Sequence, residues 1–424
     1  MSCRCMTTAT AAMIWLIVAG GAAPSAQHAH TVVTAPAPAM PTRGARRGPT
    51  KASTTPTVTF DRNGRLRAVW VESSQIFASV SDDLGRSFAK AVAVSPRPES
   101  IDAGGESRPK IAIGQRGEIY VTWTRSGTQS YMGDIRFSRS IDGGRSFTTP
   151  VTLNDDQRET GHRFDTVHVG PTGTVYVAWI DKRDLDEAAV AQRPYAGAAL
   201  YFTHSTDRGA TFSPNEKLKD HVCECCRIAV DFDGAEPVMF WRDVIDGKTR
   251  DHGIMRFRDR LTPGTPGRAT HDGWEINGCP HHGPSMSISE DKTYHLVWFT
   301  GSGPRGAGAF YARSTDGGKT TSPPMRIGSE RAFGHAVVFS RGRTVYVAVK
   351  DAVHSRDMSV QILRSEDGGS TWSKPVEALR TAGTSDHPFL FGKGDEVYLS
   401  WFTGDEGLRV VPATPAAISS RAAR

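Results

Sequence analysis

Four cysteines and a pair of adjacent histidines are concentrated in two short segments in the second half of the chain. These residues are Cys223, Cys225, Cys226, Cys279, His281 and His282. Thiolates and imidazoles are the ligands that Cu(I) and Zn(II) prefer in proteins. The two segments together therefore predict a copper or zinc site.

The same cysteines permit disulfide bonds, which are usual in exported proteins with an even number of cysteines. Two of the three connectivities that four cysteines allow contain a strained local bridge. The remaining one joins Cys223 to Cys226 and Cys225 to Cys279. Disulfides do not need the neighbouring histidines, which favour the metal, but both alternatives stay open.

A second set of chemically capable residues lies next to short apolar segments. The set consists of Arg108, Arg163, Arg183, Arg227, Arg242, His335, His387, Asp165 and Asp181. Guanidinium groups bind carboxylates through paired hydrogen bonds, and two carboxyl groups can serve as acid and base in glycoside hydrolysis. We therefore expect the arginines and histidines to bind a small molecule or glycan. Asp165 and Asp181 are catalytic candidates only if the protein is a glycosidase.

The elements that position these residues are marked by an octet, S-x-D-x-G-x-[ST]-[FW]. It occurs five times, at residues 81–88, 140–147, 205–212, 314–321 and 365–372. The fourth copy ends in threonine in place of an aromatic residue. An aspartate followed two residues later by glycine is typical of a tight turn, because the carboxylate accepts backbone N–H groups and glycine adopts a positive φ. Each octet predicts a turn between strands, not an active site.

The octet resembles the Asp box, or BNR repeat, of sialidase-like β-propellers, and the resemblance covers roughly residues 54–412. It implies an all-β propeller of four-stranded blades. The repeat occurs in sialidases, other glycosidases and non-enzymatic propellers, so it implies no single activity. Sialidases bind a sugar carboxylate with three arginines, for which Arg108, Arg163 and Arg227 are the candidates. The Phe/Tyr-Arg-Ile-Pro motif that carries the first of them is missing here.

A longer repeat gives the number of blades. Seven units, each a short apolar strand followed by a second strand that usually ends in tryptophan, start 52 to 64 residues apart. Seven units predict seven blades, with six, as in sialidases, as the alternative. The fourth unit has residues 259–264 in place of an octet, and the last stops after about three strands. A strand near residues 31–34 is a candidate for closing the ring.

Strand direction indicates where the chemistry gathers. Because strands alternate in direction within a blade, the segments that precede all the inner strands meet at one mouth of the central channel. The segments that follow the second strands meet there too. The cysteines, histidines and arginines occupy such segments, so we expect this mouth to be the functional face.

The termini indicate export. Residues 1–26 have Arg4, an apolar run at 11–19 and a small-residue cleavage site, which predict a signal peptide. The run is too short to span a bilayer, so no integral membrane segment is expected after its removal. Residues 27–52 predict a disordered linker rich in Ala, Pro and Thr, 53–412 the propeller, and 413–424 a tail.

The function that these patterns favour is ligand binding, soft-metal binding, or both, at the channel mouth of an exported propeller, periplasmic or secreted. The cofactor is then copper or zinc, and otherwise none. An exo-sialidase or related glycoside hydrolase is the enzymatic alternative, and a disulfide-bonded interaction scaffold is the third. The net charge of +6 includes no dense basic run interleaved with aromatic residues, which excludes nucleic-acid binding.

Overall fold

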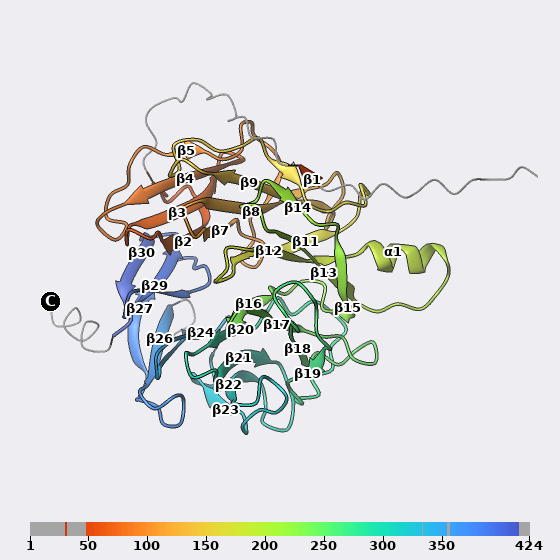
Figure 1. Ribbon diagram of the computed structural model, residues 1–424. Coiled ribbons are helices and arrows are strands. Elements are labelled where there is room, and N and C mark those ends of the chain that lie inside the picture. Colours follow the sequence, from red (N-terminus) through yellow and green to blue (C-terminus); the bar gives the residue numbers. More distant parts are fainter. Residues whose placement is uncertain (1–29, 32–47, 333, 354–356, 415–424) are drawn as a thin grey trace, which may run out of the picture.

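The computed structural model describes residues 30–31, 48–332, 334–353 and 357–414, and these form seven antiparallel sheets around a central axis (Figure 1). The architecture is a seven-bladed β-propeller with four-stranded blades, so the predicted fold is confirmed and the six-bladed alternative is wrong. The expected signal peptide, most of the linker and most of the tail lie outside the described residues.

The first four blades contain the strands up to residue 268. Blade 1 consists of β2 (Thr54–Phe60), β3 (Leu66–Glu72), β4 (Gln75–Ser81) and β5 (Val92–Ala93). Blade 2 consists of β6 (Ile101–Asp102), β7 (Lys110–Ile113), β8 (Ile119–Ser126), β9 (Gly133–Ser140) and β10 (Val151–Thr152). Blade 3 consists of β11 (His162–Val169), β12 (Val175–Asp181), β13 (Ala198–Ser205) and β15 (Glu216–Val222). Blade 4 consists of β16 (Ala229–Asp233), β17 (Glu236–Arg242), β18 (His252–Arg256) and β19 (Gly267–Arg268).

The last three blades complete the ring. Blade 5 consists of β20 (Ser285–Ile288), β21 (Tyr294–Thr300), β22 (Gly308–Ser314) and β23 (Met325–Ile327). Blade 6 consists of β24 (Val337–Arg341), β25 (Thr344–Ala352), β26 (Met358–Ser365) and β27 (Val376–Thr381). Blade 7 has three strands, β28 (Phe389–Lys393), β29 (Glu396–Thr403) and β30 (Gly407–Pro412).

The inner strands line the channel and contact one another in sequence around the ring. These strands are β2, β7, β11, β16, β20, β24 and β28, and β28 in turn contacts β2. Apolar residues fill the space between neighbouring blades, and the tryptophans near the ends of the second strands are fully buried there. The buried tryptophans are Trp70, Trp123, Trp179, Trp241, Trp298 and Trp401.

Ring closure differs from the expectation for residues 31–34. Thr31, in the two-residue strand β1 (His30–Thr31), pairs with Thr211 of β14 (Thr211–Phe212) beside blade 3, and residues 32–34 lie outside the described part. Blades 1 and 7 instead meet through side chains. The ring of Phe60 lies 5.1 Å from those of Phe391 and Tyr398. Apolar packing therefore joins the first blade to the last.

The five octets form one hydrogen-bonded turn, repeated between the third and fourth strands of blades 1, 2, 3, 5 and 6. In the first copy the Ser81 hydroxyl donates to Asp83 at 2.8 Å and accepts the Gly85 N–H at 2.8 Å. The other Asp83 oxygen accepts the Ser87 hydroxyl at 2.6 Å. The same bonds recur in the other four copies. Blade 4 has a different turn, in which Asp259 accepts two backbone N–H groups.

The single helix of the described residues, α1 (Arg183–Val190), follows β12 and lies at the edge of the molecule, away from the channel (Figure 1). It is eight residues long. Within the described part of the chain, no helix has both the length and the apolar character needed to cross a membrane.

Candidate functional site

The segments before the inner strands converge at one mouth of the channel, as their strand directions require. Glu106, which precedes β7, contacts residues from three other blades there. Its Oε2 accepts the Arg227 backbone N–H at 2.8 Å, and its Oε1 lies 3.0 Å from His335 Nδ1 and 3.5 Å from His387 Nδ1. Blades 2, 4, 6 and 7 therefore meet at one buried carboxylate.

Glu106 is the residue that sequence reasoning missed. It lies two positions before Arg108, in a segment already assigned to the mouth, so its position was available as a signal. Burial raises its pKa, but the Arg227 guanidinium and the His335 hydrogen bond outweigh burial and hold the pKa of Glu106 well below its usual range. The carboxylate at the centre of the mouth is therefore charged.

Three histidines from consecutive blades surround this carboxylate. The rings of His335 and His387 are stacked with their centres 3.5 Å apart, and the ring of His282 lies 4.6 Å from that of His335. Burial lowers the pKa of all three imidazoles, that of His282 to about 3. The histidines are neutral near pH 7 and keep a ring nitrogen lone pair for hydrogen bonds or metal ligation.

The three arginines proposed for a sugar carboxylate each hold a carboxylate of the chain itself. Arg108 donates to Asp386 and to the Gly105 and Pro56 carbonyl oxygens. Arg163 donates to Asp102 through Nε at 2.8 Å. Arg227 donates to the Pro284 and Ala336 carbonyl oxygens, both at 3.0 Å, and its Nη1 lies 3.9 Å from Glu106. Arg108 and Arg227 thereby join blades that are far apart in sequence.

Three other predicted residues line neither the channel nor the mouth cavity. Arg183, the first residue of α1, binds Asp155 at 3.0 Å and Asp181 at 2.8 Å. Asp181 also accepts the Trp179 indole N–H at 2.8 Å and is completely buried. Arg242 donates to three backbone carbonyl oxygens, those of Arg250, His282 and Phe299. These contacts hold loops in position, and their proposed roles with a ligand stay predictions.

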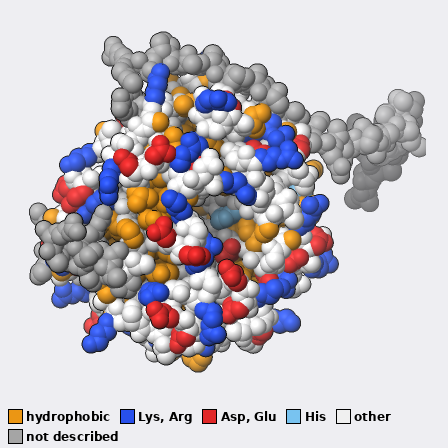
Figure 2. Space-filling model, turned by 60° about the vertical axis from the view of Figure 1, so that its left-hand side comes forward, with side chains coloured by type: hydrophobic (Ala, Val, Ile, Leu, Met, Phe, Trp, Pro, Cys, Tyr) orange, Lys and Arg blue, Asp and Glu red, His pale blue; other side chains and the backbone are white. Residues whose placement is uncertain are grey.

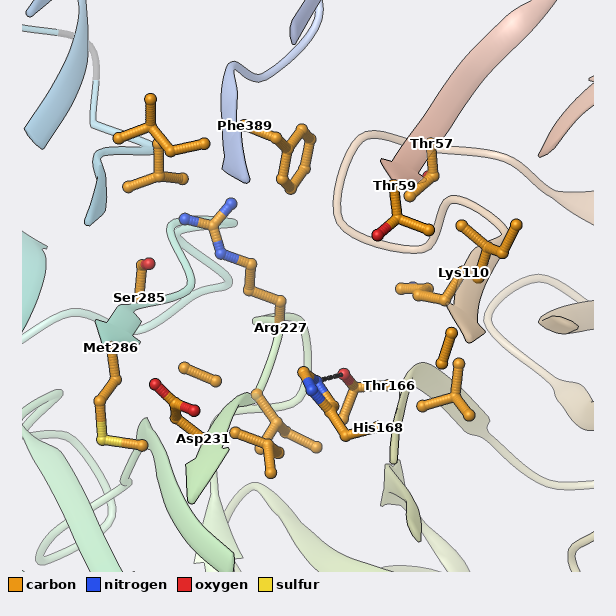
Figure 3. Close-up of a pocket in the computed structure, with 18 of the residues that line it drawn as sticks. Thr57, Thr59, Lys110, Thr166, His168, Arg227, Asp231, Ser285, Met286 and Phe389 are labelled. Atoms are coloured by element: carbon orange, nitrogen blue, oxygen red, sulfur yellow. Dashed lines mark hydrogen bonds between the residues drawn. The ribbon is translucent and has the colours of Figure 1, made fainter. Parts of the chain in front are cut away.

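Asp165 lies deeper, in the channel beneath the mouth. Its Oδ1 is 3.9 Å from the Lys110 ammonium group, and burial raises its pKa. Figure 3 shows the channel, a cavity of about 580 Å³, with Arg227, Asp231 and His168 around it. Burial also raises the pKa of Asp231, to about 6. Asp165 and Asp181 thus occupy different parts of the protein and share no cavity.

The mouth itself contains a cavity of about 250 Å³ above the histidines. Arg163, His281, His335 and His387 are among its lining residues, together with Glu106. In Figure 2 a histidine surface is visible in a hollow, with acidic and basic side chains around it. Charged, histidine and small residues therefore make up most of the lining of this small cavity.

The cysteines form a separate cluster between blades 3, 4 and 5. The Cys223 and Cys225 sulfurs lie 3.9 Å apart, and those of Cys223 and Cys226 lie 3.6 Å apart. Cys279 brings its thiol to that of Cys225 from the loop before β20. All four are free thiols, the first three buried and Cys279 exposed. The structure thus groups the sulfurs of Cys223, Cys225 and Cys226 within 4.8 Å of one another, with Cys279 beside Cys225. It places His281 and His282 at the mouth instead.

The surroundings of the thiols are apolar on one side and cationic on the other. Phe164, Val222 and Ile228 pack against the buried cysteines. Hydrogen bonds from the Cys225 and Cys226 thiols lower the pKa of Cys223, and the Arg242 guanidinium adds to this effect. Hydrogen bonds and burial raise the pKa values of Cys225 and Cys226. The pKa of Cys223 therefore lies below those of Cys225 and Cys226.

Comparisons with known proteins place the fold. No family model and no curated protein matches the chain. Among solved structures, it is similar to a polysaccharide lyase family PL25 ulvan lyase bound to -[GlcA(1-4)Rha3S]-. The TM-score is 0.55 at 11% identity, and the match covers 88% of this chain and 99% of the lyase. The polysaccharide lyase Uly1 matches with a TM-score of 0.54 at 9% identity, covering 88% of this chain and 92% of that one.

A Penicillium chrysogenum α-L-arabinanase complexed with arabinobiose has a TM-score of 0.50 at 12% identity, covering 71% of this chain and 91% of that one. These neighbours are glycan-active β-propeller enzymes. At such low identity the likeness concerns the fold alone. Membership of the sialidase-like superfamily, inferred from the octets, stays a prediction.

Proposed function

We propose that this protein is an exported β-propeller that binds a soft metal ion, Cu(I) or Zn(II), through Cys223, Cys225, Cys226 and Cys279. The observation that carries the proposal is the spacing of the sulfurs. A tetrahedral ion with metal–sulfur bonds of about 2.3 Å holds its ligands about 3.8 Å apart. The Cys223 sulfur lies 3.6 Å from that of Cys226 and 3.9 Å from that of Cys225, and these separations bracket that value.

The local environment supports this role. Cys223 is held by a backbone hydrogen bond from its N–H to the Arg242 carbonyl oxygen at 2.8 Å, so one ligand is positioned by β17. The apolar side of the cluster excludes water, and the nearby guanidinium offsets part of the negative charge of several thiolates. Cys279 is exposed and lies in a loop, which gives an ion a route of access.

Metal analysis of protein isolated from the periplasm, with every affinity tag removed, tests the proposal. We expect one copper or zinc ion per chain in the wild type and at least a tenfold loss of affinity in Cys226→Ser. Ser95→Ala, which alters a buried residue of blade 1, is the control and retains the ion. Protein that contains two disulfides and no metal would support the scaffold alternative instead.

Export is tested separately, by N-terminal sequencing of the mature protein. We expect cleavage after residue 26.

A second candidate function is the binding or cleavage of a glycan at the mouth, favoured by the cavity that Arg163, His335 and His387 line. The solved neighbours include proteins in complex with an oligosaccharide. Because the predicted arginines already bind carboxylates of the chain, we expect a neutral glycan to contact the histidines. A glycan array on which the wild type and His387→Ala show the same binding would count against this candidate.

A further inference from the structure

A second cluster of metal-ligating side chains lies at the channel axis, distinct from the thiols. The ligand atoms of Glu106, His335 and His387 all lie within 4.8 Å of one another. They come from blades 2, 6 and 7, and His282 of blade 5 packs against them. A carboxylate flanked by two neutral imidazoles is a ligand set that zinc and other borderline divalent cations bind.

The hydrogen bonding of this cluster is incomplete. His387 Nδ1 and His282 Nδ1 are buried, and neither has a hydrogen-bond partner among the described residues. His387 Nδ1 nevertheless faces Glu106 Oε1 at 3.5 Å. Buried polar atoms are almost always paired in native proteins, so unpaired nitrogens beside a carboxylate indicate a missing partner. A cation at this point would satisfy the carboxylate and an imidazole together.

The backbone leaves room for these side chains at three glycines. A β-carbon on Gly105 would lie 2.6 Å from the His387 ring, and one on Gly334 would lie 2.6 Å from His282 Nδ1. A β-carbon on Gly283 would lie 2.6 Å from Glu106 Oε2. Such distances are far below van der Waals contact. Glycines in three blades thus permit the close approach of the carboxylate and the imidazoles.

We propose that Glu106, His335 and His387 hold a second metal ion, a borderline divalent cation such as Zn²⁺, at the mouth of the channel. The three residues leave a coordination position toward the cavity of about 250 Å³, where water or a ligand oxygen completes the shell. His282 borders the site and supports the stacked rings. Arg227 partly neutralises Glu106, so the affinity is lower than that of a thiolate site.

This proposal is independent of the thiol site, and Co²⁺ distinguishes the two. Thiolate-bound Co²⁺ has intense near-ultraviolet charge-transfer absorption, whereas Co²⁺ bound by imidazole and carboxylate has weak visible bands alone. When Co²⁺ is added to the reduced, metal-free, untagged protein, we expect a second equivalent of Co²⁺ to bind without thiolate charge-transfer absorption. The variants His335→Ala, His387→Ala and Glu106→Gln are expected to weaken that step at least tenfold and to leave the thiolate step unchanged.

His271→Ala is the matched control, because His271 is exposed and lies outside both clusters. Loss of the second step in the control, or its retention in all three cluster variants, would overturn the proposal. If the variants do not fold, pulsed electron paramagnetic resonance on Cu²⁺-loaded wild type decides. Imidazole nitrogens coupled to a copper ion that lacks thiolate absorption support the second centre, and their absence rejects it. Co²⁺ binding without any thiolate charge-transfer absorption would reject the thiol site but would leave the carboxylate–imidazole site standing.

Discussion

At the scale of single residues, the arginines of the mouth hold the protein together. Arg108 is the most buried of the three that pair across the mouth, with 3% of its side chain exposed, against 18% for Arg163 and 13% for Arg227. It links blade 2 to Asp386 of blade 7 and stacks on Phe389 with a separation of 4.3 Å. Removing one partner of such a pair leaves a buried charge uncompensated.

We therefore expect Arg108→Ala to lower the free energy of unfolding by about 3–5 kcal/mol, measured by denaturant titration. The more exposed pair of Arg163 with Asp102 provides the comparison, and Arg163→Ala is expected to lower it by about 1 kcal/mol or less. Equal effects of the two substitutions would show that burial of the Arg108 pair does not determine stability.

The clustering of the cysteines could be predicted from the sequence because three of them lie within four residues of one another. The position of Glu106 in a mouth segment was visible in the sequence, but the side chains that pair with it could not be predicted in this way. Its partners Arg227 and His335 lie 121 and 229 positions away, and only the closed ring brings them together. The ion pairs of the arginines could not be predicted for the same reason, because nothing near Arg108 in the sequence indicates that Asp386 neutralises it. Local patterns identify the candidate residues, whereas their partners depend on pairing across the closed ring.

At the scale of elements, the octet is a self-contained turn whose conformation depends on a charged aspartate. Hydrogen bonds from Ser87 and Ser81 lower the pKa of Asp83 to about 2, from an ordinary value of 3.8. Hydrogen bonds from Thr320 and Ser314 lower that of Asp316 equally, to about 2. The lowered pKa means that the folded protein binds the aspartate proton more weakly than the unfolded chain does.

These aspartates therefore stabilise the fold fully above about pH 4, and their contribution is lost as the pH falls toward 2. We expect the denaturant midpoint to decrease over this interval in the wild type. The double variant Asp83→Asn and Asp316→Asn is expected to be less stable at pH 6 and to show a shallower decrease. Identical pH profiles for the two proteins would contradict this account of the turn.

The octets and the 52–64 residue spacing were sufficient to predict the blades because each unit repeats local turn and strand chemistry. Closure of the ring was harder to predict. Residues 31–34 are the candidate closing strand in the sequence, yet Thr31 pairs beside blade 3. The closure depends on aromatic packing of Phe60 with Phe391 and Tyr398, which has no signature in either segment alone.

At the scale of the whole molecule, the closed ring brings residues that are far apart in the sequence to the same place. Seven inner strands bring segments from six blades to one mouth, and adjacent blades bring Cys279 to Cys225. The two proposed metal centres differ in chemistry, one being a thiol cluster between blades and the other a carboxylate–imidazole cluster on the axis. Both depend on the ring, and neither exists in a single blade.

The most direct test of the central claim is X-ray absorption spectroscopy at the zinc and copper edges on untagged protein from the periplasm. The account predicts an occupied thiolate site, with three or four sulfur neighbours at about 2.3 Å that disappear in Cys226→Ser. Protein free of both metals, or metal surrounded by nitrogen and oxygen at about 2.0 Å without sulfur, would contradict it.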